Sequence, residues 1–206
     1  VDFINNTLLG STQIALDGSA LIISTRKSYP STFYREFRII DCTFSNNSTM
    51  DVEYTSTFVF EDSAGKTNLL IEGCLFENNV SEEGNSCFEF EGHNNDTTST
   101  ITLRNCLFKD NSSYRTTVGL DSPRYDVLVD GCRFTENQIG FSGAALIALG
   151  NVKVLNCLID ENTNPIGGAG LIIGSDHISD TLLIANCTIV GNFSPVGFLQ
   201  MSAVNN

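Results

Sequence analysis

A seven-residue pattern that recurs along the chain constrains the fold more than any other feature. Each copy contains a cysteine, a Phe or Ile two positions later and an asparagine five positions later. The six copies are residues 41–47, 73–79, 105–111, 131–137, 156–162 and 186–192, and a seventh copy without the cysteine opens the chain at residues 1–6. Successive cysteines lie 32, 32, 26, 25 and 30 residues apart. A fixed core with a variable spacer predicts a solenoid.

The residues around each cysteine predict the strands. Three and five positions before every cysteine stand apolar residues, such as Ile71 and Leu69 before Cys74, and these share one face of a strand. The residue directly before the cysteine is Asp, Gly or Asn. These types tolerate a left-handed backbone, so we expect a bend there. The cysteine and the Phe or Ile then face inward from a second strand, and a third apolar run, such as residues 145–149, follows each asparagine.

The pattern therefore predicts an all-β, right-handed parallel β-helix, a β-solenoid of the pectin-lyase-like type. We expect about seven coils, each with three short strands, in a single domain over residues 1–206. The asparagine of each coil should bond to its neighbours above and below and satisfy the turn backbone. The expected inward ladders are Cys42, Cys74, Cys106, Cys132, Cys157 and Cys187; Phe44, Phe76, Phe108 and Phe134; and Asn47, Asn79, Asn111, Asn137, Asn162 and Asn192.

The repeat resembles a known family. Phe-x-x-Asn paired with Gly-Gly-Ala-aliphatic is the repeat of the chlamydial polymorphic membrane proteins and related surface adhesins. Residues 3–6, 44–47, 76–79, 108–111 and 134–137 match the first half, and Ile159 and Ile189 replace Phe in the last two copies. Residues 167–169 match the opening of the second half, and Gly170 delays its aliphatic residue. The resemblance implies an autotransporter passenger or adhesin, and it brings no catalytic residue.

Composition excludes some functions. The net charge of −13 argues against nucleic acid as a partner, because phosphate binding needs a basic surface. The chain has no run of 18 apolar residues, so we expect no membrane span. Seven cysteines leave at least one unpaired. We interpret the six laddered cysteines as buried thiols, because coils stack ~4.8 Å apart and disulfide Cβ atoms lie ~3.5–4.5 Å apart. Stacked disulfides are the alternative.

Residues able to perform catalysis or bind metal are few, and we predict no enzymatic activity and no cofactor. His93 and His177 lie in loop-like sequence and in no Cys-His spacing of a metal site. Glu136 and Glu161 stand four positions after their cysteines, with Asp160 beside them. Stacked carboxylates could hold Ca²⁺, and the alternative is that they splay into solvent.

Several surface features bear on partners. Asn95, in a loop, is the best N-glycosylation candidate, followed by Asn46 and Asn5. Four other Asn-x-Ser/Thr asparagines, Asn47, Asn79, Asn111 and Asn192, occupy the predicted inward ladder. The connections between a third strand and the next first strand vary most, and they form either a contact ridge or tolerated surface loops. Two predicted outward positions carry leucines, which are covered by these loops or contact another molecule. These leucines are Leu70, Leu128 and Leu183, and Leu75, Leu107 and Leu158.

The most economical hypothesis is a non-catalytic structural module of an extracellular or cell-surface fibre or adhesin, which stacks head-to-tail with its own copies. Val1 and Phe3 of one copy would take the cysteine and phenylalanine positions, and Val204 and Asn206 of another would supply the preceding strand and bend. This junction is either a covalent tandem repeat or noncovalent, and an excerpt of a longer β-helix is the alternative. Rival functions are a carbohydrate-active lyase or hydrolase, and a monomeric adhesin passenger that binds a cell-surface protein or glycan.

Overall fold

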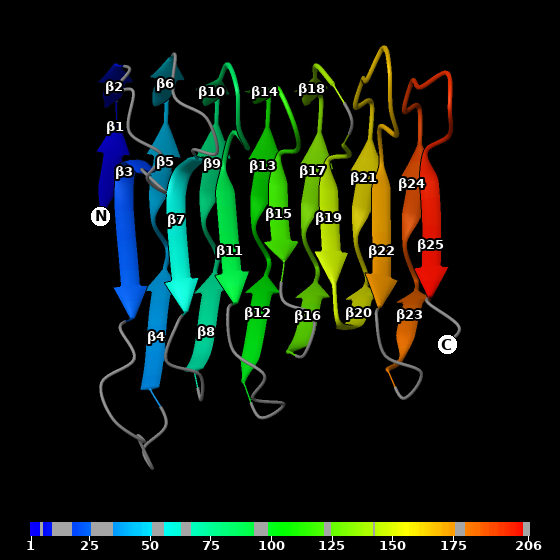
Figure 1. The fold of residues 1–206 in the computed structure, drawn as a ribbon, viewed down its shortest axis with the longest axis horizontal. Helices are drawn as coiled ribbons and strands as arrows, with labels where there is room; N and C mark the ends of the chain where they lie inside the picture. Colours follow the sequence, from blue (N-terminus) through cyan, green and yellow to red (C-terminus); the bar gives the residue numbers. More distant parts are fainter. Residues whose placement is uncertain are drawn as a thin grey trace.

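The computed structural model is a right-handed parallel β-helix whose coils stack along one axis (Figure 1), as the repeat predicts. Every named strand pairs in parallel with the equivalent strand of a neighbouring coil. The structure describes residues 1–4, 6–9, 18–25, 35–50, 56–62, 67–92, 99–121, 125–141, 143–175 and 180–203.

Four sheets run along the axis, numbered here in the order in which a coil passes through them. The first contains β4 (Arg35–Ile40), β8 (Thr67–Glu72), β12 (Thr100–Arg104), β16 (Asp126–Asp130), β20 (Asn151–Leu155) and β23 (Leu182–Ala185). The second contains β1 (Asp2–Ile4), β5 (Thr43–Ser45), β9 (Leu75–Glu77), β13 (Leu107–Lys109), β17 (Arg133–Thr135), β21 (Leu158–Asp160) and β24 (Thr188–Val190).

The third and fourth sheets complete each coil. The third contains β2 (Thr7–Leu9), β6 (Ser48–Met50), β10 (Val80–Ser81), β14 (Ser112–Ser113) and β18 (Gln138–Ile139). The fourth contains β3 (Gly18–Thr25), β7 (Ser56–Asp62), β11 (Phe88–Gly92), β15 (Val118–Asp121), β19 (Leu146–Leu149), β22 (Leu171–Ser175) and β25 (Leu199–Ala203). In Figure 1 the fourth sheet lies in front of the layer formed by the first and second sheets.

Two details of the predicted architecture were wrong. A coil has four strands, because a strand of two or three residues follows the inward asparagine, as in β10 and β14. These strands are too short for sequence alternation to show them. We predicted about seven coils, whereas the solenoid makes about five complete turns. The second and fourth sheets have seven strands each, but among the described residues the first coil has no first-sheet strand and the last two coils have no third-sheet strand.

Left-handed residues make the two bends that separate the sheets. The residue before each cysteine has φ between 51° and 65°, so the predicted bend between the first and second sheets is present at Asp41, Gly73, Asn105, Gly131, Asn156 and Asn186. A second bend, which we did not predict, lies four positions after each cysteine, with φ between 54° and 66°. Its residues are Asn46, Asn78, Asp110, Glu136, Glu161 and Gly191. Two bends of the same hand in each coil turn the chain from the first sheet into the third.

Candidate functional site

The asparagines that precede the third sheet form a hydrogen-bonded ladder. Asn79 illustrates it, because its Nδ2 donates to the Phe44 carbonyl at 2.9 Å and to Asn111 Oδ1 at 3.0 Å. The Asn79 backbone N–H also donates to Asn111 Oδ1, at 2.9 Å. The same bonds link consecutive coils from Asn6 to Asn192. Asn47, Asn79, Asn111, Asn137 and Asn162 are fully buried.

The ladder has a polarity. Each asparagine donates its backbone N–H and one Nδ2 hydrogen to the Oδ1 of the next coil toward the C-terminus. In the first coil, Asn6 donates to Asn47, and in the last coil Asn192 accepts from Asn162. A coil stacked on β24 would therefore have to present an oxygen to the backbone N–H of Asn192.

A column of aromatic rings runs beside the ladder. Phe3, Phe44, Phe76, Phe108 and Phe134 stack with centroid distances of 4.7, 4.6, 4.9 and 4.7 Å and nearly parallel planes. Ile159 and Ile189 continue the column through the register of β17, β21 and β24. The four rings that follow Phe3 in the column are fully buried. Ring stacking and apolar burial thus reinforce the coil spacing that the ladder sets.

The laddered cysteines are free thiols in the structure. Five are buried and Cys187 is partly exposed. Cys74 Sγ lies 3.4 Å from the carbonyl of Glu72 in its own coil and 3.5 Å from that of Ile39 in the coil before it. Cys106, Cys157 and Cys187 have the same two acceptors in their coils. The hydrogen bond with Cys106 and burial raise the pKa of Cys74. Cys87 lies outside the ladder, and complete burial raises its pKa as well.

The described residues add no support to the calcium hypothesis for the acidic column, which stays a prediction. Glu136 and Glu161 are bend residues, and the described residues contain no group of three or more His, Cys, Asp or Glu that could hold a metal. Two of these carboxylates pair with cations of the chain. Lys109 Nζ lies 3.6 Å from Glu136 Oε2, and Arg133 donates to Asp160 Oδ2 at 3.1 Å.

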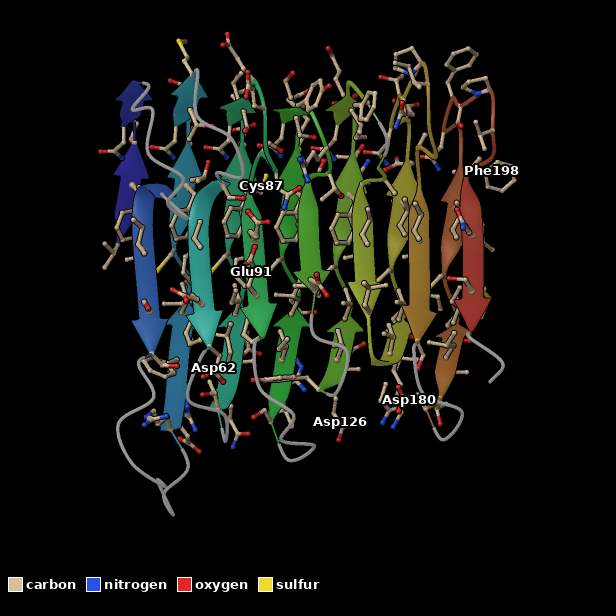
Figure 2. All side chains as sticks on the ribbon, in the orientation of Figure 1. Asp62, Cys87, Glu91, Asp126, Asp180 and Phe198 are labelled. Carbon is tan, nitrogen blue, oxygen red and sulfur yellow. The ribbon has the colours of Figure 1, made fainter. Side chains whose placement is uncertain are left out.

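A different group of carboxylates gathers on the outer face of the fourth sheet. Glu61, Glu91 and Asp121 stand in register on β7, β11 and β15, and we call them the carboxylate row. Figure 2 shows Glu91 on β11. Glu89 lies two residues before Glu91 and faces the same way. Burial, and then the negative charges of Glu91 and Asp121, raise the pKa of Glu89 to about 8, although Ser56 donates to it at 3.3 Å.

The carboxylate row does not follow from the sequence repeat, for an identifiable reason. Its members follow the ladder asparagines by 14, 12 and 10 residues, so no constant offset from the repeat connects them. The turn between the third and fourth sheets differs in length, and only the pairing of β7, β11 and β15 brings them together. The signal that was available is alternation within the third apolar run, where Glu89 and Glu91 interleave with Phe88 and Phe90.

The structure places the other predicted residues as follows. Asn46 is exposed at a bend, whereas Asn5, Asn95, His93 and His177 lie outside the described residues. Val204 and Asn206 of the predicted junction also lie outside them. Val1 is 80% exposed. The predicted outward leucines are half-buried except Leu183, which is exposed, so the choice between covering loops and a partner stays open.

Two shallow grooves mark the outer surface. One of about 400 Å³ crosses the corner of the third sheet and includes Gln138, Thr163 and Phe193. The other, of about 230 Å³, lies on the first sheet and includes Arg38 and Arg104. Both arginines have carboxylate neighbours, Glu36 at 3.3 Å for Arg38 and Asp130 at 3.9 Å for Arg104, so neither groove concentrates uncompensated positive charge.

A family model described as the right-handed β-helix region matches residues 3–206. The search of curated proteins and the search of solved structures gave no match. Within the part of the chain that the structure describes, no helix has the length and hydrophobicity needed to cross a membrane.

Proposed function

The chain belongs to the family of the right-handed β-helix region, and we propose that it is a non-catalytic structural module of an extracellular or cell-surface fibre or adhesin. In this proposal the module stacks head-to-tail with further copies of itself. The observation that carries it is the asparagine ladder. Its polar groups are used in bonding one coil to the next rather than being aimed at a cavity, so the interior serves stacking.

The surfaces of the two outermost coils support the stacking. Leu199 and Met201 of β25 pair in register with the buried Leu171 and Ile173, yet they are 44% and 50% exposed. Phe198, just before β25, is 54% exposed (Figure 2). Burying such residues under another coil would contribute about 25 cal/mol for each Å² of apolar surface removed from water.

The first coil offers a matching surface. If it were placed on the last coil, β1 would follow β24, Phe3 would continue the column beyond Ile189, and Asn6 Oδ1 would accept from the Asn192 backbone N–H. The opposite orientation would bring two ladder ends of the same kind together. The contact is therefore heterologous and propagates instead of closing on itself.

Sedimentation of the 206-residue chain over a wide concentration range, with electron microscopy of the products, tests this proposal. We expect assemblies that lengthen with concentration. Met201→Lys puts a charge on the stacking surface and should leave monomers. The matched control is Gln200→Lys, which faces outward from the same strand and should assemble like the wild type. A folded wild-type chain that stays monomeric at its highest concentration would end the proposal.

The extracellular location and the adhesin role rest on the resemblance of the Phe-x-x-Asn repeat to chlamydial surface proteins. A monomeric adhesin passenger that binds a protein or glycan through its surface loops fits the same resemblance. Labelling of intact source cells with a reagent that cannot cross membranes tests the location. Protection of the chain from the reagent in intact cells, with labelling after lysis, would contradict it.

A carbohydrate-active enzyme is the second candidate, and Glu89 is the observation that favours it. A carboxyl group with a pKa of about 8 keeps its proton at neutral pH, and further carboxyl groups of the row lie beside it. Glycosidases use such a pair as general acid and as base or nucleophile. Turnover of any polysaccharide by the wild type, lost in Glu89→Gln and retained in Glu77→Gln, would establish this function in place of the first.

A further inference from the structure

The fold sorts the N-glycosylation sequons of the chain into two classes. Six asparagines that begin an Asn-x-Ser/Thr sequence lie in the described residues. Four of them belong to the ladder: Asn47, Asn79, Asn111 and Asn192. The other two, Asn46 and Asn186, are exposed bend residues. We propose that a eukaryotic secretory pathway attaches N-linked glycans to Asn46 and Asn186 and none to the buried ladder positions Asn47, Asn79 and Asn111, an inference that rests on the proposed extracellular location.

The buried ladder positions Asn47, Asn79 and Asn111 cannot accept a glycan in the folded chain. N-glycosylation replaces one hydrogen of Nδ2 by a sugar. Both Nδ2 hydrogens of Asn111 are used, one in the bond to the Phe76 carbonyl at 3.0 Å and one in the bond to Asn137 Oδ1 at 2.9 Å. The side chain is fully buried, so no sugar fits beside it. Asn47 and Asn79 are held and buried in the same way.

Asn46 and Asn186 meet the opposite conditions. Their φ angles of 56° and 55° turn the backbone at a corner, and both residues are exposed. The Asn46 Nδ2 bonds to its neighbour Ser45 at 2.7 Å, and the Asn186 Nδ2 bonds to the exposed Asn156 at 3.3 Å. Only one Nδ2 hydrogen of each side chain is used in these bonds, so a sugar can replace the other while the surface hydrogen bond is kept.

The two acceptors lie where glycans do not interfere with the proposed stacking. Asn46 stands between β5 and β6, and Asn186 stands between β23 and β24, so both are at outer corners of the solenoid. The Asn186 side chain bonds to Asn156 of the preceding coil, away from the surface on which another copy would stack. The fourth sheet with its carboxylate row carries neither acceptor.

The experiment is site-by-site glycopeptide mapping of the chain secreted from cultured eukaryotic cells. Mapping by site is needed because Asn5 and Asn95, outside the described residues, also begin sequons. We expect glycans on Asn46 and Asn186 of the folded wild type, and Asn186→Gln should lose only its own. The sequons of Asn46 and Asn47 overlap, so two variants separate them.

Thr49→Val removes the Asn47 sequon and should leave the Asn46 glycan in place. Valine suits this site because Thr49 is 2% exposed and its hydroxyl makes no hydrogen bond among the described residues. Ser48→Ala removes the Asn46 sequon, and the glycan should disappear without moving to Asn47. A glycan on Asn79 or Asn111 of folded protein, or an unmodified Asn46 or Asn186, would overturn the inference. Stacking is measured on unglycosylated chain made in bacteria, so either proposal can fail alone.

Discussion

The Tyr125 hydroxyl donates a hydrogen bond of 3.0 Å to Asp62 Oδ2, although the two residues are 63 positions apart in the sequence. Both side chains are fully buried, and Thr25 donates to the other carboxylate oxygen of Asp62 at 2.5 Å. Gly92, in β11, makes the approach possible, because a Cβ there would lie 2.8 Å from the Tyr125 ring. The buried Asp62–Tyr125 hydrogen bond thus connects the end of β7 to the residue before β16, and it passes the end of β11 at Gly92.

Replacement of Tyr125 by Phe tests the value of this bond. The ring still packs edge-on against Phe90, whose centroid is 5.3 Å away, so the loss comes from the hydroxyl alone. Leaving a buried carboxylate short of one donor should lower the free energy of unfolding by about 1–3 kcal/mol. Tyr114→Phe is the control, because Tyr114 is 40% exposed and its change should be within about 0.5 kcal/mol. Equal stability of the two variants in urea unfolding would contradict the assignment.

The parts of this fold that sequence predicts are those that recur at fixed spacing. The first two strands, the bend at positions such as Gly73 and the inward direction of Asn79 all follow from residue types counted from the cysteine. The Asp62–Tyr125 pair and the carboxylate row do not, because turns of different length separate them from the repeat. Pairing between coils decides which residues meet, and that register depends on the whole solenoid.

Asn111→Asp probes the ladder. The new carboxylate would face two acceptors, the Phe76 carbonyl and Asn137 Oδ1, with no donor to give them. We expect a loss on the order of 3 kcal/mol or more at pH 7. Burial raises the pKa of such an aspartate above its unfolded value of about 3.9, so the deficit relative to wild type should grow as pH rises from about 4 toward 7.

Asn78→Asp is the matched control for the ladder variant. Asn78 is the exposed neighbour of Asn79 at the second bend, and Asp110 occupies the equivalent position of the next coil. The protein therefore already accepts aspartate there, and the stability should change by less than about 0.5 kcal/mol. A control as unstable as Asn111→Asp would mean that charge alone, and not the ladder, explains the loss.

Phe108→Ala tests the aromatic column. The ring is fully buried between Phe76 and Phe134, and its removal loses apolar burial and leaves a cavity. The expected cost is about 3–5 kcal/mol in chemical unfolding. Phe141→Ala removes a ring that is 44% exposed and stacked on Tyr114, so it should cost clearly less. A loss below about 1 kcal/mol for Phe108→Ala would show that its ring does not pack in the core.

Glu161→Gly tests the second bend, and here we expect a gain. Glu161 has φ = 57°, a conformation that costs an L-residue roughly 1–2 kcal/mol and glycine almost nothing. Glycine loses more backbone entropy on folding, so the net gain should be roughly 0.5–1 kcal/mol. The next coil already has Gly191 at this position. Glu77→Gly, at the last residue of strand β9, should destabilise by a similar amount, and a loss in both variants would refute the argument.

Glu89 should make stability depend on pH. Its folded pKa of about 8 exceeds its ordinary value of 4.5 because burial and neighbouring carboxylates disfavour the charged form. Below about pH 4.5 the group is protonated in both states and carries no penalty. As pH rises from about 4.5 to 8, the unfolded chain releases the proton and the folded chain keeps it, so stability falls over this window. Glu89→Gln should remove that part of the slope, whereas the exposed-bend variant Glu136→Gln should retain it. Unfolding free energies measured at half-unit pH steps decide the matter, and parallel pH profiles for wild type and Glu89→Gln would show that Glu89 titrates normally.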